Sequence, residues 1–356
     1  MKLSRFLFIS LSVTALITGV TITGSCGKNN SSTAAGRSVH NEANSIYYWK
    51  TTLALDSVER EFLRCHDVKR AYVRFFDVVT DKSATAMETV VPNATIHFND
   101  TLPVKGIIPV VYITLDAMRS MKGDEKKWAE KISDRARNIC AYNNLGKLWE
   151  LQLDCDWTED TRDSFFELCR EVRNRICENN ESIGKVSSTI RLHQLSQPAP
   201  PVDYGVLMVY NTGSFKNPDA ANSILDPADV KPYLKKLGSY PLHLDVAYPA
   251  YEWQLLFRDN NFTGLLRYEL PDSTGILKHT GGNRYVLTRD TIVGETYLKQ
   301  GDVIRRESSP AHTVLEVKKL IDSKLGNRPH SNVIYHLDNR NLSKYTSDEI
   351  KDIYTQ

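Results

Sequence analysis

The sequence has almost no excess of charge of either sign. It contains 45 Lys and Arg residues against 43 Asp and Glu residues, and removal of residues 1–25 would take away Lys2 and Arg5 and no acid. The remaining 43 basic and 43 acidic residues give no extended positive field of the kind that attracts nucleic acid or an anionic membrane surface. We therefore expect no nucleic-acid partner.

The cysteines lack the spacing of a metal site. No C-x-x-C pair occurs, and no cysteine lies beside a histidine at ligand spacing. Structural zinc sites depend on such pairs, so we expect no metal and no other cofactor. Most of these cysteines fit buried positions as small apolar residues, although a disulfide between Cys155 and Cys169 stays open as an alternative. Besides Cys26, the chain contains Cys65, Cys140, Cys155, Cys169 and Cys177.

The N-terminus carries the one long apolar run. Residues 6–23 have no charge, they follow Lys2 and Arg5, and they precede Gly24-Ser25-Cys26. This order is typical of an export signal, and the small residues before Cys26 resemble a bacterial lipobox, in which the cysteine becomes the lipidated first residue. The resemblance implies a signal peptide over 1–25, a lipid on Cys26 and a polar tether over 26–44. A transmembrane anchor is the alternative. We expect a protein of the cell envelope that faces the periplasm, because no acidic cluster follows Cys26.

From residue 45 onward, short apolar strands alternate with amphipathic helical patterns. Alternating strands and helices indicate a parallel sheet, and eight strands predict a closed (β/α)8 TIM-like barrel over 45–356. An open doubly wound sheet is the alternative. The expected strands are 45–52, 70–79, 106–115, 148–157, 185–195, 203–213, 241–249 and 331–339.

The connection between the seventh and eighth expected strands is unusually long. Residues 283–307 alternate like antiparallel hairpins, and the "TGGNR" sequence at 280–284 is a hairpin turn signal. We expect residues 265–330 to form an insertion at the C-terminal rim of the barrel, where long loops commonly shape a site.

Polar and aromatic residues gather at the expected C-terminal ends of the strands, which is where parallel barrels carry their sites. Broad rings stack on the C–H faces of a sugar, and acids, amides and arginines bond its hydroxyl groups. No nucleophile and base pair is apparent for peptide hydrolysis. We therefore expect a glycan or oligosaccharide partner. The candidates that bind it are Trp49, Arg74, Trp157, Arg191, His193, Tyr210, Asn211, Tyr248, Trp253 and Asp338, and the candidate catalytic acids are Asp154, Asp156 and Asp245.

The stretch Leu151 to Thr158 resembles the D-x-x-D-x-D-x-E strand of chitinase-like glycoside hydrolases. Asp154 and Asp156 match the second and third acids, whereas Leu151 and Thr158 occupy the places of the first aspartate and the proton-donating glutamate. More widely, "LQLDCDWTEDTRDSFFELC", "VDYGVLMVYNTG" and "VIYHLDNRNL" look like an uncharacterised bacterial barrel family of glycosidase-like proteins. The resemblance implies a TIM barrel and a glycan substrate, with the proton donor missing from its usual place.

Two interpretations of the acids stay open. Asp156 would be the general acid of a glycosidase if like-charge repulsion from Asp154 kept it protonated, with Asp245 or Asp338 as base or nucleophile. Alternatively, Asp154 pairs with Arg74 or Arg191 inside the barrel as a compensated buried charge. The second interpretation favours a glycan-binding or envelope-assembly lipoprotein without turnover.

Overall fold

The computed structural model describes residues 43–355 except 82, 84–88, 147, 149, 178–183, 267–269 and 271–274. The expected signal peptide, Cys26 and most of the expected tether lie outside the described residues. Within the described residues, no helix is long and apolar enough to cross a membrane.

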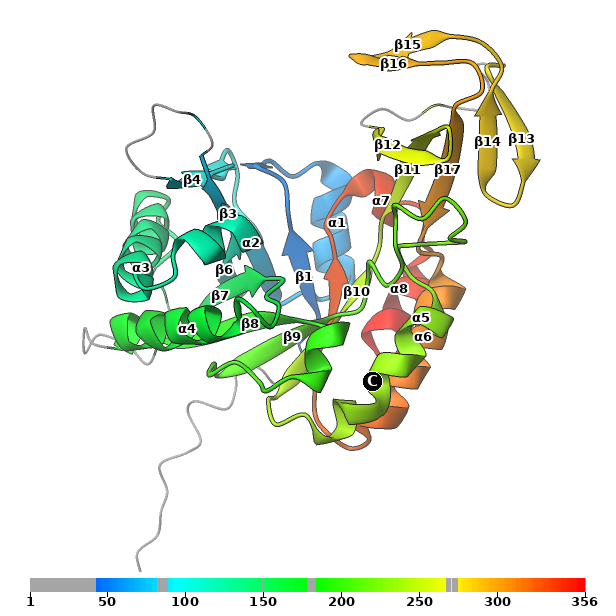
Figure 1. Cartoon of the computed structure of the whole chain (residues 1–356). Coiled ribbons are helices and arrows are strands. Elements are labelled where there is room, and N and C mark those ends of the chain that lie inside the picture. Colours follow the sequence, from blue (N-terminus) through cyan, green and yellow to red (C-terminus); the bar gives the residue numbers. More distant parts are fainter. Residues whose placement is uncertain are drawn as a thin grey trace, which may run out of the picture. The chain divides into compact units, whose positions relative to one another are not determined.

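Eight parallel strands close into a barrel (Figure 1), which confirms the predicted fold class. Each strand pairs in parallel with its neighbours, and β1 closes the ring by pairing with both β3 and β18. All eight lie within or overlap the ranges expected from the sequence. They are β1 (Ser45–Tyr48), β3 (Arg70–Thr80), β6 (Gly106–Ile113), β7 (Glu150–Cys155), β8 (Lys185–Arg191), β9 (Tyr204–Met208), β10 (Leu244–Pro249) and β18 (Asn332–Tyr335).

Helices cover most of the outer wall, with α3 and α4 on one side and α5, α6 and α8 on the other (Figure 1). Their inward stripes are apolar, as amphipathic helices require. The helical elements are α1 (Ser57–Cys65), α2 (Leu115–Ser120), α3 (Glu125–Tyr142), α4 (Arg162–Cys177), the 3-10 helix η1 (Leu192–Ser196), α5 (Pro227–Val230), the 3-10 helix η2 (Lys231–Ser239), α6 (Ala311–Leu325), α7 (Asn339–Leu342) and α8 (Ser347–Tyr354).

The alternation in β7 separates two cores. Leu151, Leu153 and Cys155 belong to the large apolar layer between strands and helices. Gln152 faces the barrel axis, where its Oε1 accepts a hydrogen bond of 2.7 Å from the hydroxyl group of Tyr47. The inner core is smaller and is formed by Tyr47, Tyr72, Ile108, Val110, Val206, Met208, Ala247 and Val333. The period of two in the sequence therefore marks the two faces of a barrel strand.

The insertion between β10 and β18 is an antiparallel sheet with the strand order β12-β11-β17-β14-β13, and a separate hairpin of β15 and β16. It begins at Glu252, earlier than the expected residue 265, and the helix α6 inside the expected range joins the barrel wall instead. The expected turn at 280–284 connects β13 and β14, and Gly281 and Gly282 supply its positive φ angles of 124° and 56°. The strands are β11 (Glu252–Arg258), β12 (Asn261–Leu265), β13 (Leu277–Gly281), β14 (Arg284–Leu287), β15 (Thr291–Val293), β16 (Thr296–Leu298) and β17 (Val303–Ser308).

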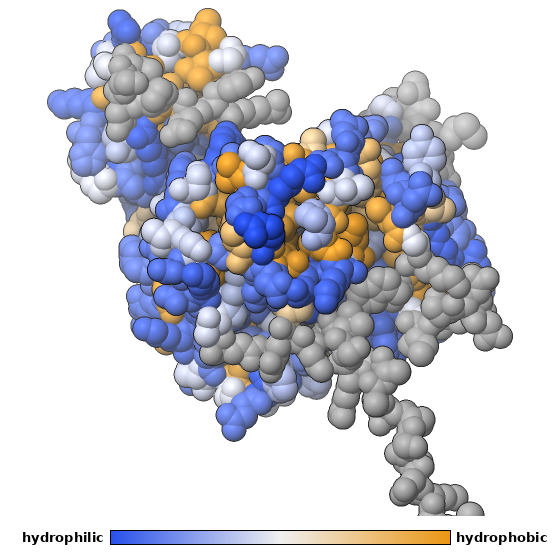
Figure 2. Space-filling model, turned by 180° about the vertical axis from the view of Figure 1, so that it is seen from behind, coloured by the Kyte–Doolittle hydropathy of each residue, from blue (hydrophilic) through white to orange (hydrophobic). Residues whose placement is uncertain are grey.

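Seen from behind, the insertion is a lobe that projects from the barrel (Figure 2). This side of the lobe is largely hydrophilic, with hydrophobic residues at its tip. Six buried residues, Leu256, Leu270, Ile276, Leu287, Leu298 and Ile304, give it a small core of its own. The insertion is therefore a folded element rather than an irregular loop.

Candidate functional site at the barrel mouth

A cavity of about 300 Å³ opens where the strands β6 to β9 end. In a parallel barrel the carboxyl ends of all strands meet at one mouth, so inward-facing residues near those ends converge. The cavity is lined by Tyr112, Asp156, Arg191, Leu192, His193, Met208, Tyr210, Asn211, Thr212 and Tyr233. Five of these, Asp156, Arg191, His193, Tyr210 and Asn211, were expected from the sequence.

The floor of the mouth holds a partly buried ion pair. The Nη2 atom of Arg191 donates to Oδ1 of Asp154 over 2.8 Å, and the hydroxyl group of Thr189 donates to the same oxygen over 2.6 Å. The Asp154 side chain is only 4% exposed. Burial by itself would lower the pKa of Arg191, but Asp154, Tyr210 and Asp156 together raise it above its ordinary value. Asp154 is therefore a charge-compensated carboxylate, as the second interpretation of the sequence expected.

Asp156 is the carboxylate that the cavity presents to solvent. Its side chain is 53% exposed just past the end of β7, with Oδ1 at 4.0 Å from Nε of Arg191 and 3.5 Å from Nε2 of His193. Arg191 thus contacts both acids. The positive charge of Arg191 therefore lies beside both carboxylates and reduces the repulsion between them.

A row of aromatic rings crosses the mouth beside the cavity. Tyr210 stacks on Tyr335 with ring centroids 4.6 Å apart, and Trp49 lies 5.7 Å from Tyr335. The guanidinium group of Arg74 lies 5.5 Å from the centre of the Trp49 ring and is held in place by two bonds to Asp77. Burial raises the pKa of both tyrosines, so their hydroxyl groups stay protonated at neutral pH. The mouth therefore offers ring faces and neutral hydroxyl groups beside Asp156.

The placement of Asp245 differs from the expectation. It is the second residue of β10, so it lies near the N-terminal end of the strand, and the mouth lies at the C-terminal end. Its carboxylate is buried, at 3.2 Å from Nη1 of Arg70 and 2.7 Å from the backbone N–H of Ser331. Asp245 is thus part of an ion pair at the N-terminal end of the barrel, and it cannot act with Asp156.

Trp157 and Tyr248 also lie away from the cavity, because both face the helices. Trp157 is fully buried against Phe165 and Phe166 of α4, with ring centroids at 6.3 and 5.3 Å. Tyr248 is fully buried in the same outer layer. Each directly neighbours an inward-facing position in the sequence, and the alternation of an extended strand turns it outward.

Asp338 and Trp253 have structural partners outside the cavity. Asp338 caps the N-terminus of α7 by accepting from the backbone N–H of Arg340, and it lies 3.4 Å from Nζ of Lys50. Trp253 lies on β11 of the insertion, and its indole N–H donates to Glu307 over 2.6 Å. Both positions therefore hold neighbouring elements together.

Three aromatic residues of the mouth were not expected. Tyr112 and Tyr335 occupy inward-facing positions at the ends of β6 and β18, and the period of two in those strands would have indicated them. Tyr233 reaches the cavity from η2, and nothing in its local sequence points to the mouth.

Thr158, at the place of the expected proton donor, lies at the start of α4. Its carbonyl oxygen accepts from the backbone N–H groups of Thr161 and Arg162 at 3.0 and 2.8 Å. Its hydroxyl group bonds to Asp160, whose carboxylate also accepts from Arg119. Thr158 therefore helps to begin the helix.

A larger cavity lies elsewhere. It measures about 950 Å³ and lies on the outer wall between α3 and residues 90–99. We place the candidate site at the mouth because the Asp154–Arg191 pair and the aromatic row meet there. The size of the outer cavity does not by itself indicate a function. Within the described residues, no group of three or more His, Cys, Asp or Glu side chains is arranged to hold a metal ion.

Together, the parallel strands and their helices define a closed (β/α)8 TIM-like barrel with a polar, aromatic mouth. No protein-family model matches the chain, and no curated protein matches its sequence. Solved structures do resemble it. The spore cortex-lytic enzyme SleL of Bacillus cereus has a TM-score of 0.51 and 12% identity, over 89% of this chain and 75% of that one. A chitinase of Chromobacterium violaceum has a TM-score of 0.51 and 10% identity, over 88% of this chain and 100% of that one. At these identities the likeness shows the fold.

Proposed function

We propose that this chain is a lipid-anchored protein of the cell envelope whose barrel mouth binds a glycan without hydrolysing it. The observation that carries the proposal is the cavity in which Asp156, Arg191 and Asn211 lie beside the rings of Tyr210 and Tyr335. Aromatic faces with a few convergent polar groups are typical of a ligand pocket. The similar barrels named as a chitinase and a spore cortex-lytic enzyme support a glycan as the ligand.

The contacts and positions of the candidate acids favour binding over hydrolysis. Glycoside hydrolysis ordinarily uses two carboxyl groups, one of which donates a proton. Here Asp154 is committed to Arg191 and Thr189, Asp245 lies at the opposite end of the barrel, and Thr158 replaces the glutamate of the resembling family. Of the three candidate catalytic acids, Asp156 alone is exposed, and a single carboxylate serves as a hydrogen-bond acceptor for sugar hydroxyl groups.

The test is isothermal titration with chitin oligosaccharides and cell-wall fragments, paired with a reducing-end assay for product. We expect binding by the wild type, no product, and about tenfold weaker binding by Asp156→Asn, because a charge-assisted hydrogen bond becomes a neutral one. Asp348→Asn is the matched control, since Asp348 is 89% exposed on α8, outside the mouth. Product release by the wild type that Asp156→Asn abolishes would establish a hydrolase instead. Equal binding by both proteins would remove the mouth as the site.

The lipid anchor is a separate part of the proposal, and it depends on the sequence around Cys26. Metabolic labelling with an alkyne fatty acid in a bacterial host should label the wild type but not Cys26→Ser. Cys65→Ser, which removes an exposed thiol of the barrel, should keep the label. Label on Cys26→Ser, or none on the wild type, would contradict lipidation of Cys26.

A further inference from the structure

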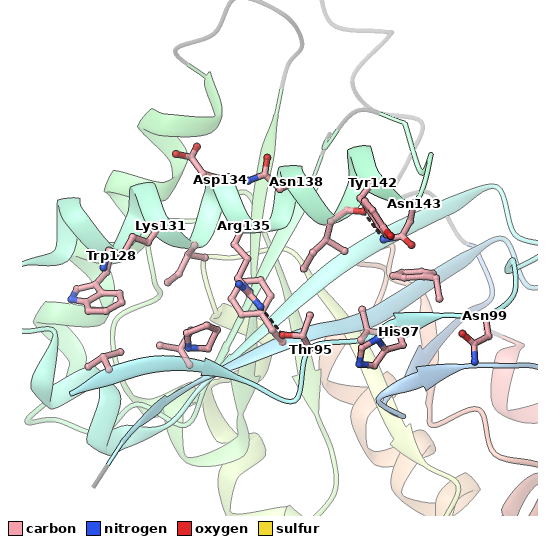
Figure 3. Close-up of a pocket in the computed structure, with 18 residues that line it drawn as sticks. Thr95, His97, Asn99, Trp128, Lys131, Asp134, Arg135, Asn138, Tyr142 and Asn143 are labelled. Carbon is pink, nitrogen blue, oxygen red and sulfur yellow. Dashed lines mark hydrogen bonds between the residues drawn. The ribbon is translucent and has the colours of Figure 1, made fainter. Parts of the chain in front are cut away.

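The large outer cavity exists because the barrel departs from its own repeat. Each strand of a (β/α)8 barrel is ordinarily followed by a helix that covers its outer side. Between β3 and β6, the described residues contain no helix. The chain instead turns back as β4 (Val90–Asn93), which is antiparallel to β3, and then continues through the short strand β5 (His97–Phe98). This leaves a groove of about 950 Å³ between α3 and residues 90–99 (Figure 3).

A cation without a carboxylate partner lies in the middle of the groove. The guanidinium group of Arg135 stacks 5.2 Å from the centre of the Phe76 ring, and its Nη2 donates to the hydroxyl group of Thr95 over 2.8 Å. Within the described residues Arg135 forms no ion pair, and its buried Nε atom has no hydrogen-bond partner. An arginine held in one position but not neutralised is suited to bind a carboxylate, which its planar donors recognise.

The nearby acid does not neutralise this cation. Asp134 points away from the groove in Figure 3, and its carboxylate pairs with Arg137 at 3.1 Å and Arg175 at 3.2 Å. Lys131, one turn before Arg135 on α3, lines the same groove. Among the described residues that line the groove, Arg135 is therefore a cation that Asp134 does not neutralise.

The accessible groups of the groove are those that bind sugars. Tyr142 is 87% exposed at the end of α3 and offers a free ring face. The exposed side chains of His97, Asn99 and Asn138 form no hydrogen bonds with other described residues, so their donors and acceptors are open to a ligand. By contrast the apolar floor is covered, since Phe76, Val78, Val90, Ile96 and Ile132 are each at most 5% exposed. The groove therefore exposes little apolar surface for a hydrophobic ligand. It offers a polar chain one aromatic ring and several hydrogen-bonding groups.

We propose that this groove is a second binding site, for a sugar chain that bears carboxylates, with one carboxylate on Arg135 and one sugar ring on Tyr142. The site binds and does not cleave, because Asp134, the only acid among the described residues that line it, is turned away and paired. It lies on the outer wall of the barrel and does not depend on the glycan proposed for the mouth.

The test is isothermal titration of the full protein with two acidic tetrasaccharides, galacturonate and hyaluronan, and with their methyl esters. We expect the acidic forms to bind and the esters to bind at least tenfold more weakly. Arg135→Gln should weaken acidic binding at least tenfold. Asn138→Asp should do the same by placing a negative charge in the groove, and because Asn138 is exposed this variant does not risk the fold. Tyr142→Ala should weaken binding about fivefold by removing the ring.

Tyr297→Ala is the control, since it removes a tyrosine that is 49% exposed on the insertion, and it should leave binding unchanged. The proposal is overturned if neither acidic chain binds, if the esters bind equally well, or if Asn138→Asp binds like the wild type. Loss of acidic binding in Asp156→Asn would move the ligand to the mouth and would also overturn it. Glycan binding at the mouth with none in the groove would leave the proposed function intact.

Discussion

A single guanidinium group organises the acids of the barrel mouth. Arg191 lies 2.8 Å from Asp154 and 4.0 Å from Asp156, so one partly buried cation balances one buried and one exposed carboxylate. A buried carboxylate is costly unless it is paired and hydrogen-bonded. Thr189 supplies the additional hydrogen bond. The same contacts that compensate the charge of Asp154 inside the barrel therefore occupy its carboxylate, so that it is not available as a catalytic acid or base.

His336 makes the stability of the barrel depend on pH. Burial lowers its pKa from 6.5 to about 4. Between pH 6.5 and 4 the unfolded chain therefore takes up a proton that the folded chain does not, and stability falls as the pH falls through this window. The loss approaches about 3 kcal/mol at pH 4, at 1.36 kcal/mol for each pKa unit.

We expect His336→Gln to lose less stability than the wild type between pH 6.5 and 4, as measured by urea unfolding at half-unit steps. His312→Gln, which replaces an exposed histidine at the start of α6, should follow the wild type. Parallel pH profiles for His336→Gln and the wild type would show that His336 is protonated in the folded protein.

Much of the mouth could be predicted at the residue scale, because an extended strand alternates strictly. Asp156 and Arg191 were found from their positions near strand ends, and Tyr112 was available from the same rule. Trp157 and Tyr248 were misplaced because their aromatic character was given more weight than the alternation of side chains along the strand, which turns both of them outward. Asp245 was misplaced because its position along the strand was ignored. That position decides whether an inward-facing residue lies at the mouth or at the opposite end of the barrel, just as the alternation decides whether it faces inward or outward.

At the scale of elements, α1 shows how a helix start also joins two segments of the wall. Asp56 caps the helix by accepting from the backbone N–H of Glu59 over 2.8 Å, and the Glu59 carboxylate accepts from the backbone N–H of Asp56 over 3.3 Å. The second oxygen of Asp56 accepts from the amide of Asn339 over 2.9 Å. One carboxylate therefore stabilises α1 and connects it to α7.

We expect Asp56→Ala to lower the free energy of unfolding by about 1 kcal/mol or more, because a lost cap alone costs about that amount. Asp56→Ser should keep the cap and lose only the bond to Asn339, so its loss should be the smaller of the two. Urea unfolding measures both. Equal losses in the two variants would assign the whole effect to the contact with α7.

The barrel elements were predictable because each strand is a short apolar run set off by an amphipathic helix. The insertion was harder. Its first strand, β11, follows β10 after a brief connection and has the same apolar character, so the sequence marks no boundary at Glu252. Helix α6 has an ordinary amphipathic pattern, and only the three-dimensional structure assigns it to the wall. The described residues between β3 and β6 form no helix, and the only sequence signal of this is the irregular stretch around residue 96.

At the scale of the whole molecule, the insertion holds part of the barrel mouth in place. Arg305 of β17 is fully buried, and its Nη2 donates to the carbonyl oxygen of Phe215 over 3.2 Å. Its Nη1 donates to the carbonyl oxygens of Asn217 and Pro218. These residues follow Asn211 in the loop that enters the cavity. The sheet of the insertion therefore positions a loop of the candidate site.

Removing Arg305 should release this loop. Its Nε lies 2.7 Å from Oε1 of Glu307, so Arg305→Leu leaves a buried carboxylate without its cation, which costs about 3 kcal/mol or more. We expect faster amide exchange over residues 212–222 by mass spectrometry and a lower free energy of unfolding. Arg305→Leu with Glu307→Gln should recover part of the stability, because the unpaired charge is gone, but not the slow exchange, because the carbonyl groups of the loop still lack their donor. Lys299→Ala, at an exposed position of the same insertion, should change neither. If the double variant also restored slow exchange, the charge pair rather than the bonds from Arg305 would hold the loop.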